Sequence, residues 1–390
     1  MESRDRETHV KAHQVWLLAV GVCALTVAAC SGSSDSGHTS STNSAMPPIA
    51  QTSAYAVTSL VSDGAVPADN MDKDLKNPWG IAFDPLGPTW LADNGSNFST
   101  LYIDLGIKFP ITVSIPAGSN GPAQPTGIVY NNSLSGFKIG KAGAIGKAQF
   151  IFSGESGTIS AWSELTLSNL DMGAETVYDD GPGGAVYTGL AIAKNDSGSF
   201  LYATDFHNAK IDVFDQTFKK ITSVGNFADP ALPTGYAPFG IQAIGDLLYV
   251  TYASQQGPAN QHEMVGSGLG LVDLFDANGT LMRRVTTGGP LNAPWGIAMA
   301  PANFGQFSKD LLIGNFGDGT INAFDPVTGQ FIDSLRDASG KPLSISGLWG
   351  IAFGNSPLAV SNWLYFAAGI NDRADGLYGR ITESTVNESK

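Results

Sequence analysis

One short phrase recurs along this chain and limits what it can fold into. Trp-Gly-Ile-Ala is written three times, and a looser form keeps only the glycine and the aliphatic residue after it. Together these copies occur six times, at 79–82, 126–129, 188–191, 239–242, 295–298 and 349–352. Successive copies start 47 to 62 residues apart, which is near the period of about 40–50 residues typical of propeller blades. The spacing therefore predicts six repeated structural units.

Each copy is followed by short runs in which apolar and polar residues alternate. After Trp79 comes "TWLADNGSNFSTLY", and after Trp295 comes "DLLIGNFGDGTINAFD". Runs of this kind, bounded by Gly, Asn and Asp, are typical of β-strands joined by tight turns. No window has the period of a sustained amphipathic helix. Four short strands per repeat in an all-β chain predict a six-bladed β-propeller over residues 54–382.

The two ends of the chain complement each other. The last repeat supplies three strand-like runs, near Trp349, Trp363 and Leu377, before residues 383–390, which we predict to be a disordered tail. The run "AYAVTSLVSD", which starts at Ala54, is strand-like and has no repeat of its own. We predict that it becomes the outer strand of the last blade, because this closes the ring and covers an exposed edge. A loose N-terminal arm is the alternative.

The N-terminus has the pattern of an export signal. Basic residues precede the apolar run "VWLLAVGVCALTVAAC", which is too short for a comfortable membrane span. The small residues before Cys30 resemble a bacterial lipobox, so residues 1–29 are predicted to be a lipoprotein-type signal peptide and Cys30 the lipidated residue. The Ser-rich stretch 30–53 suits a flexible tether. We expect a lipid-anchored protein of the bacterial envelope, at the outer membrane or cell surface; an ordinary signal peptide and secretion are the alternative.

Charge and cysteine content exclude some functions. The formal net charge is −14 at pH 7, and the 21 Lys and Arg residues are scattered, so a nucleic-acid partner is not expected. The two cysteines, Cys23 and Cys30, both precede the predicted propeller. The propeller itself therefore has no disulfide, thiolate nucleophile or cysteine metal site.

Whole blades of the sequence resemble a known family. "GYAPFGIQAIGDLLYVTYA" and "TGGPLNAPWGIAMAPANFGQFSKDLLIGNFGDGTINAFDPVTG" are similar to bacterial secreted or anchored β-propellers related to NHL-repeat proteins. The resemblance covers about residues 59 to 380 and implies an NHL-like propeller fold without an assigned activity. Some members carry an exosortase-type C-terminal sorting signal. This chain ends in "STVNESK" instead, so we expect the lipid on Cys30 to replace that anchor.

Two sets of residues are expected at one mouth of the central channel. Aromatic residues precede the repeat glycine where the inner strands begin, and polar phrases such as "ADNGSN", "TDFHN" and "GINDRAD" follow the second strands. Loops on such a rigid scaffold are the usual place for a binding site. The predicted binding residues are Trp79, Asp93, Asn94, Asp205, His207, Phe239, Trp295, Asn315, Trp349, Asn371 and Asp372. Two alternatives remain open, namely that the Asp and Asn residues only stabilise their own turns and that the aromatic residues only pack between blades.

Catalytic patterns are sparse. His207 and His262 are the histidines within the predicted propeller, and no nucleophile elbow is present. The adjacent His262 and Glu263 would point to opposite faces of a strand, which is poor metal geometry. We therefore expect a non-catalytic binding or scaffold protein whose partner is a protein, peptide or glycan, and predict no cofactor. The alternative is a lactonase-like hydrolase or lyase that uses Ca²⁺ or another divalent ion at the mouth.

The lipid anchor can be tested directly. Replacing Cys30 with Ala removes the thiol that would carry the lipid, so the protein should leave the membrane fraction. Fractionation of the expressing bacterium, followed by immunoblotting, measures the change, with Cys23→Ala as the matched control. Unchanged partitioning of the Cys30→Ala protein would contradict the anchor.

Overall fold

A computed structural model of the chain describes residues 53–384, except 104, 134, 142–143, 167–172 and 224. The predicted signal peptide, Cys30 and nearly all of the tether lie outside the described residues, as does the tail from residue 385. Among the described residues, no helix is long and apolar enough to cross a membrane.

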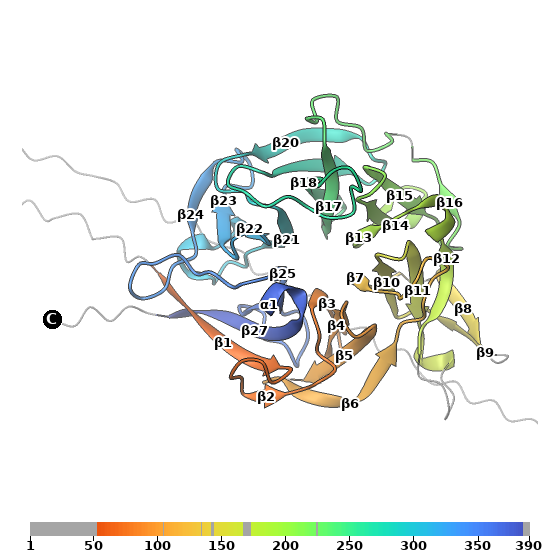
Figure 1. The fold of residues 1–390 in the computed structure, drawn as a ribbon, viewed down its shortest axis with the longest axis horizontal. Helices are drawn as coiled ribbons and strands as arrows, with labels where there is room; N and C mark the ends of the chain where they lie inside the picture. The colour runs from red at the N-terminus through yellow and green to blue at the C-terminus, as the bar shows by residue number, and fades with distance from the viewer. Residues whose placement is uncertain are drawn as a thin grey trace, which may run out of the picture. The chain divides into compact units, whose positions relative to one another are not determined.

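The described residues form a ring of six antiparallel β-sheets, which confirms the predicted all-β, six-bladed propeller (Figure 1). Each blade has four main strands that run outward from the centre. The innermost strands are β3 (Pro78–Phe83), β7 (Pro125–Tyr130), β13 (Tyr187–Asn195), β17 (Tyr236–Ile244), β21 (Pro294–Met299) and β25 (Leu348–Phe353). The second strands are β4 (Thr89–Asp93), β10 (Phe150–Gly154), β14 (Gly198–Asp205), β18 (Leu247–Ser254), β22 (Leu311–Asn315) and β26 (Leu364–Gly369).

The outer strands complete the same six sheets. The third strands are β5 (Phe98–Ile103), β11 (Thr158–Trp162), β15 (Lys210–Phe214), β19 (Leu271–Asp276), β23 (Ile321–Phe324) and β27 (Asp375–Ser384). The fourth are β6 (Ile107–Ser114), β12 (Glu175–Asp179), β16 (Lys220–Ile221), β20 (Leu281–Thr287), β24 (Phe331–Ser334) and β1 (Ala54–Ser62). Additional elements are β2 (Asn70–Met71), the hairpin β8 (Lys138–Lys141) and β9 (Ala144–Lys147), the short 3₁₀ turns η1 (Glu164–Thr166), η2 (Gly181–Gly183) and η3 (Gly305–Phe307), and α1 (Ile370–Arg373).

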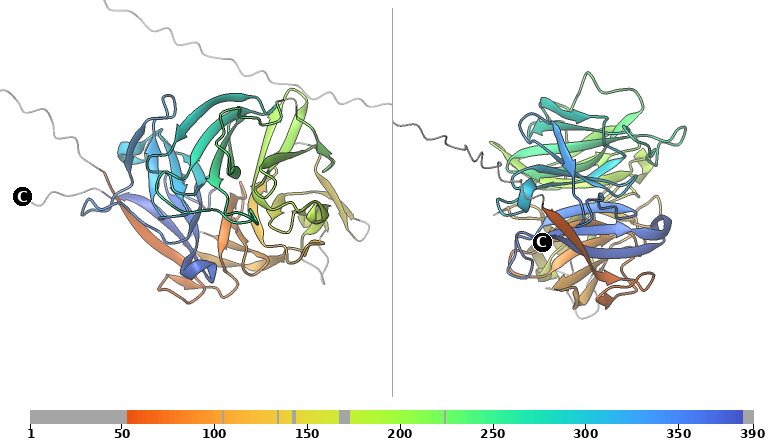
Figure 2. Two further views of the ribbon diagram at one scale, coloured as in Figure 1. Left: turned by 45° about the horizontal axis from the view of Figure 1, so that its top comes forward. Right: turned by 90° about the vertical axis from the view of Figure 1, so that its left-hand side faces the viewer.

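The ring closes through the N-terminal strand, as predicted. β1 pairs antiparallel with β27 from Ala54, opposite Ser384, to Ser62, opposite Leu377. The first and last strands of the fold therefore lie side by side (Figure 2). The short β2 pairs in parallel with the outer side of β1. Strands from opposite ends of the described chain thus share one sheet, and β1 supplies the fourth strand of the last blade.

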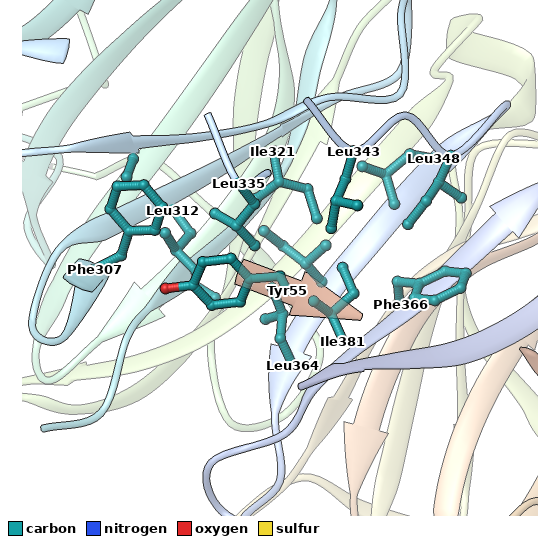
Figure 3. Close-up of a cluster of buried hydrophobic side chains, with 14 of the residues drawn as sticks. Tyr55, Phe307, Leu312, Ile321, Leu335, Leu343, Leu348, Leu364, Phe366 and Ile381 are labelled. Carbon is teal, nitrogen blue, oxygen red and sulfur yellow. The ribbon is translucent and has the colours of Figure 1, made fainter. Parts of the chain in front are cut away.

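Tyr55 anchors the closing strand in the core between blades five and six. Its side chain is 1% exposed, and its ring lies 5.0 Å from Phe304 and 5.7 Å from Phe307 between ring centroids. Its hydroxyl donates a hydrogen bond to the Phe304 carbonyl at 3.0 Å. Leucine and isoleucine side chains of the last two blades surround it (Figure 3). The closing strand is therefore held by packing as well as by backbone pairing.

The repeated glycine lies where neighbouring inner strands come closest. A methyl group on Gly240 would lie 2.2 Å from the Trp295 carbonyl oxygen, and one on Gly296 would lie 2.5 Å from that of Trp349. The same contact recurs for Gly80 and Gly350, and a methyl on Gly127 would meet the Leu190 amide nitrogen. At Gly189 the contact is looser, with the Phe239 carbonyl oxygen at 3.2 Å. A Cβ at these positions would overlap backbone, which cannot move aside as a side chain can. The repeat therefore preserves the close packing of six blades around one axis.

Gly296 and its cross-strand partner Gly314 provide a matched test of this constraint. Gly296→Ala should lower the free energy of unfolding by about 1–3 kcal/mol or more, because the new methyl group overlaps a backbone carbonyl. A methyl on Gly314 would instead meet the Leu348 side chain at 3.2 Å. Gly314→Ala should therefore stay within about 1 kcal/mol of wild type. Urea denaturation of the two variants gives the comparison, and equal losses would contradict it.

Candidate functional site

A polar cavity lies at the end of the channel where the inner strands begin. Its volume is about 610 Å³, within the range of roughly 300–1,000 Å³ found for ligand sites. It is bounded by blades one, two, three and six and by a long loop of blade four. The lining residues are Asn77, Asn94, Gly95, Asn120, Gln124, Glu155, Ser156, Val186, Gln261, His262 and Arg373. We refer to it as the mouth cavity.

Aromatic side chains fill the channel beside the mouth cavity. Trp79 and Trp349 stack with ring centroids 3.5 Å apart, and Trp295 lies edge-on to Trp79 at 5.9 Å. Phe239 lies 5.9 Å from Trp349, and Phe316 stacks on Trp349 at 4.1 Å. We call these five residues the aromatic plug. Asn77, directly before β3, lines the mouth cavity, while Trp79 in β3 belongs to the plug and Ile81 in β3 lines a second cavity of about 570 Å³. The plug therefore divides the channel.

The plug changes the role expected of the predicted aromatic residues. Trp79 and Phe239 are each 1% exposed and Trp349 is 0% exposed, so they cannot contact a ligand in the mouth. Trp295 is half-buried, and its indole nitrogen donates a hydrogen bond to the Thr188 carbonyl at 2.9 Å. The sequence correctly predicts that these side chains meet at the axis. It leaves open whether they bind a ligand or only pack between blades, and their burial favours packing.

Threonine replaces the aromatic residue in blades two and three. Thr126 donates a hydrogen bond to the Tyr187 carbonyl at 2.8 Å, and Thr188 donates one to the Phe239 carbonyl at 2.7 Å. Both hydroxyls therefore join their own blade to the next one. The four aromatic side chains of the other blades are enough to occupy the axis, so the two small residues serve as links between blades.

A chain of hydrogen bonds runs from the plug to the wall of the mouth cavity. The Trp349 indole nitrogen donates to Asn77 Oδ1 at 3.0 Å, and Asn77 Nδ2 donates to Asn94 Oδ1 at 3.0 Å. Asn94 Nδ2 then donates to Glu155 Oε2 at 2.7 Å and to the Gln124 carbonyl at 3.1 Å. Each amide is held by both its oxygen and its nitrogen. The chain links blades six, one and two and fixes the position of the Glu155 carboxylate.

Arg373 reaches the mouth cavity from an unusual backbone segment. Asn371, Asp372 and Arg373 have φ values of 53°, 54° and 69°, a left-handed conformation that non-glycine residues rarely adopt. The guanidinium carbon lies 4.7 Å from the Phe316 ring centroid and 5.2 Å from that of Trp349. Arg373 also forms an ion pair with Glu263. Strained segments of this kind concentrate at functional sites.

The long loop of blade four, residues 255–270, extends across the mouth. Gln255 Nε2 donates to the Phe206 carbonyl of blade three at 2.5 Å, and the Ala259 carbonyl lies 3.0 Å from His207 Nδ1. Glu263 pairs with Arg373 of blade six, and the Gly266 amide donates to Asn292 Oδ1 at 2.7 Å. The loop is therefore attached to blades three, five and six. It brings Gln261 and His262 into the lining of the mouth cavity.

The two glutamates of the site share an electrostatic environment. Burial raises the pKa of Glu155, while the hydrogen bond from Asn94 and the charge of Arg373 oppose that rise. Burial likewise raises the pKa of Glu263, and its partner Arg373 again acts in the opposite direction. Burial thus disfavours the charged form of both carboxylates, and Arg373 favours it.

Most of the predicted polar residues stabilise their own turns. Asp93 accepts a hydrogen bond from the Thr100 amide at 2.8 Å, and Asp205 accepts two from Asn208. Asn315 Nδ2 donates a hydrogen bond to the Pro290 carbonyl at 2.7 Å. All three predicted residues are 0% exposed. Within the described ranges, no three His, Cys, Asp or Glu side chains come together as a possible metal site.

The remaining predicted residues lie at or near the rim. Asn94 is the predicted polar residue that lines the mouth cavity. His207 touches the blade-four loop. Asn371 and Asp372 are exposed, and Asn371 bonds to Asp375 at 2.9 Å. Their contribution is the left-handed backbone that positions Arg373.

Four residues that define the site are not among the residues predicted from the sequence, namely Asn77, Glu155, Glu263 and Arg373. A signal existed for Glu155, because it follows β10 directly, as Asn94 follows β4. Alignment of the blades on the ends of their second strands would have found it. Arg373 lies inside the phrase "GINDRAD", but nothing in the sequence shows that three left-handed residues turn it over the plug.

The sequence and the fold are similar to those of several known proteins. No protein-family model matches the sequence. Two uncharacterized proteins of Acanthamoeba polyphaga mimivirus are each 32% identical to it, over 85% and 84% of this chain and 87% and 80% of their own lengths. Among solved structures, a soluble aldose sugar dehydrogenase from Escherichia coli has a TM-score of 0.50 at 14% identity, covering 85% of this chain and all of that one. Virginiamycin B lyase from Staphylococcus aureus has a TM-score of 0.48 at 16% identity, over 84% and 99% of the two chains. At these identities the likeness to solved structures concerns the fold alone.

The burial of the plug makes a prediction about stability. Trp349→Ala should lower the free energy of unfolding by about 3–5 kcal/mol, because it removes a fully buried ring and leaves a cavity. Trp295→Ala should cost less, since Trp295 is half-buried. Denaturant unfolding monitored by circular dichroism measures both. A Trp349→Ala protein as stable as wild type would show that the plug is not part of the core.

Proposed function

This chain belongs to the same protein family as the two uncharacterized mimivirus proteins, and we propose that it is a non-catalytic binding protein whose mouth cavity holds a small polar ligand. The observation that supports this most strongly is the hydrogen-bond chain from Trp349 to Glu155. It fixes polar groups around an accessible cavity before any ligand arrives. Preorganisation of this kind lowers the entropy lost on binding.

The composition of the cavity wall indicates the kind of ligand. Five of the lining residues are amides: Asn77, Asn94, Asn120, Gln124 and Gln261. An amide both donates and accepts hydrogen bonds, so the wall is complementary to groups that do the same, such as hydroxyls and amides. A saccharide or a short peptide-like molecule has this character. The wall carries little apolar surface to hold a hydrophobic compound.

We further propose that the protein acts at the cell envelope. The pattern that ends at Cys30 and the Ser-rich stretch after it support export and a lipid anchor. A propeller on such a tether would meet ligands outside the cell. Membrane association would then depend on the N-terminus and ligand binding on the mouth cavity, so the two can be tested separately.

The hydrolase alternative required oxygen ligands that converge on one ion. Asp93, Asp205 and Asn315 instead bond to their own turns or to neighbouring backbone. Of the predicted oxygen donors, Asn94 lines the mouth cavity, and its oxygen accepts from Asn77. This geometry favours the binding function over the metal-dependent one.

Binding can be tested with a panel of small polar compounds. The full chain is screened by thermal shift against neutral mono- and disaccharides, amino sugars and dipeptides, and compounds that raise the melting temperature are titrated calorimetrically. Asn94→Ala should weaken such binding by at least about tenfold, because it removes one amide and releases a second.

The control is Gln330→Ala, an exposed amide on an outer turn, which should leave the affinity unchanged. Two outcomes would contradict the proposal: a panel in which no compound stabilises the protein, or ligands whose affinity is the same with and without the Asn94 side chain.

A further inference from the structure

Among the described residues that line the mouth cavity, Glu155 is the charged group without an ionic partner. We infer that the ligand carries a cationic group, an ammonium or a guanidinium, which pairs with the Glu155 carboxylate. This inference rests on the binding function proposed above and specifies the chemistry of its ligand.

Most other buried carboxylates among the described residues are paired with a basic side chain. Lys or Arg lies within ion-pair distance of Asp63, Asp72, Asp205, Asp212, Asp229, Asp273 and Glu263. Within the described part of the chain, Glu155 has one side-chain hydrogen bond, from the neutral amide of Asn94, and no such ion pair. An ionised carboxylate that is partly removed from water gains most from a cation beside it.

Asp93 shows why the lack of a partner matters at Glu155 in particular. Asp93 also has no ion pair with any described residue, but it is 0% exposed, and burial raises its pKa well above the usual range. Because Asp93 is enclosed, a ligand cannot reach it. Glu155 lines an accessible cavity, where a ligand can approach it.

The charges around the cavity leave one negative charge in excess. Two glutamates, Glu155 and Glu263, face a single arginine, and Arg373 is engaged by Glu263 and by the Phe316 ring. No other Lys, Arg, Asp or Glu among the described residues lines the cavity, so its acidic groups outnumber its basic ones by one. The whole chain carries −14, and such a field favours the approach of cations over anions. Local and long-range electrostatics therefore select for the same ligand charge.

A cysteine at the rim measures this preference directly. Gln261 is exposed and lines the mouth cavity, and the sole native cysteines, Cys23 and Cys30, precede the propeller. Gln261→Cys is introduced into the full-length Cys23→Ser, Cys30→Ser protein. This variant is treated either with the cationic reagent aminoethyl methanethiosulfonate or with the anionic reagent sulfonatoethyl methanethiosulfonate. The thiolate attacks the reagent sulfur and releases methanesulfinate, leaving a mixed disulfide. The ratio of the two rates reports the local preference for a cation, because both reagents react with the same thiolate.

We expect the ratio of the cationic reagent's reaction rate to that of the anionic reagent to be about five- to tenfold higher at Gln261→Cys than at Ala338→Cys, an exposed control position. Adding Glu155→Gln should reduce the ratio to within about twofold of that control, whereas Glu155→Asp should keep most of it. A ratio at the control level, or one that Glu155→Gln leaves unchanged, would overturn the inference. The test uses no natural ligand, so an unsuccessful binding screen does not affect it.

A second measurement follows from the burial of the same carboxyl. Its pKa is higher in the folded protein than in the unfolded chain, so stability falls as pH rises through the interval between the two values. Glu155→Gln should therefore melt at a higher temperature than wild type at pH 8, and the difference should shrink toward pH 4. A variant that melts lower at pH 8 would show that Glu155 is already compensated within the protein, which contradicts the need for a cationic ligand.

Discussion

The structure depends on the close contact between each inner-strand glycine and the backbone of the next blade. A methyl group at Gly240 or Gly296 would overlap a carbonyl oxygen of the neighbouring strand. Six such contacts bring the inner strands close enough for the residue before each glycine to reach the axis. Trp79 and Trp349 can then stack at 3.5 Å. The glycine repeat therefore determines not only the blades but also the closed centre of the ring.

The closed centre makes the mouth cavity a blind pocket rather than a pore. Aromatic side chains that occupy the axis leave polar groups of the surrounding loops to form the walls. Trp349 serves both purposes, because its ring packs in the plug while its indole nitrogen holds Asn77. The site is thus continuous with the core, so substitutions in the plug are expected to affect stability and binding together.

The features of the mouth that carry chemistry are also the ones that oppose stability. Three consecutive left-handed residues deliver Arg373, and Glu155 lies in a site that raises its pKa, without an ionic partner among the described residues. Both features disfavour folding locally, whereas most of the other buried carboxylates named above are paired. Such costs persist where a function requires them. A functional requirement of this kind also explains why the residues of the site depart from the regular repeat.

The sequence by itself determined the number of blades, the closure of the ring by its first strand and the structural role of the repeated glycine. These features depend on periodic patterns that repeat along the chain. Only the tertiary structure decided that the tryptophans are core, that most predicted acidic and amide residues serve their own turns, and that Glu155, Glu263 and Arg373 meet. Those residues are separated by more than one hundred positions in sequence. Their proximity depends on a single loop and a single left-handed turn. Neither belongs to the sequence repeat, so the repeat does not predict that these residues meet.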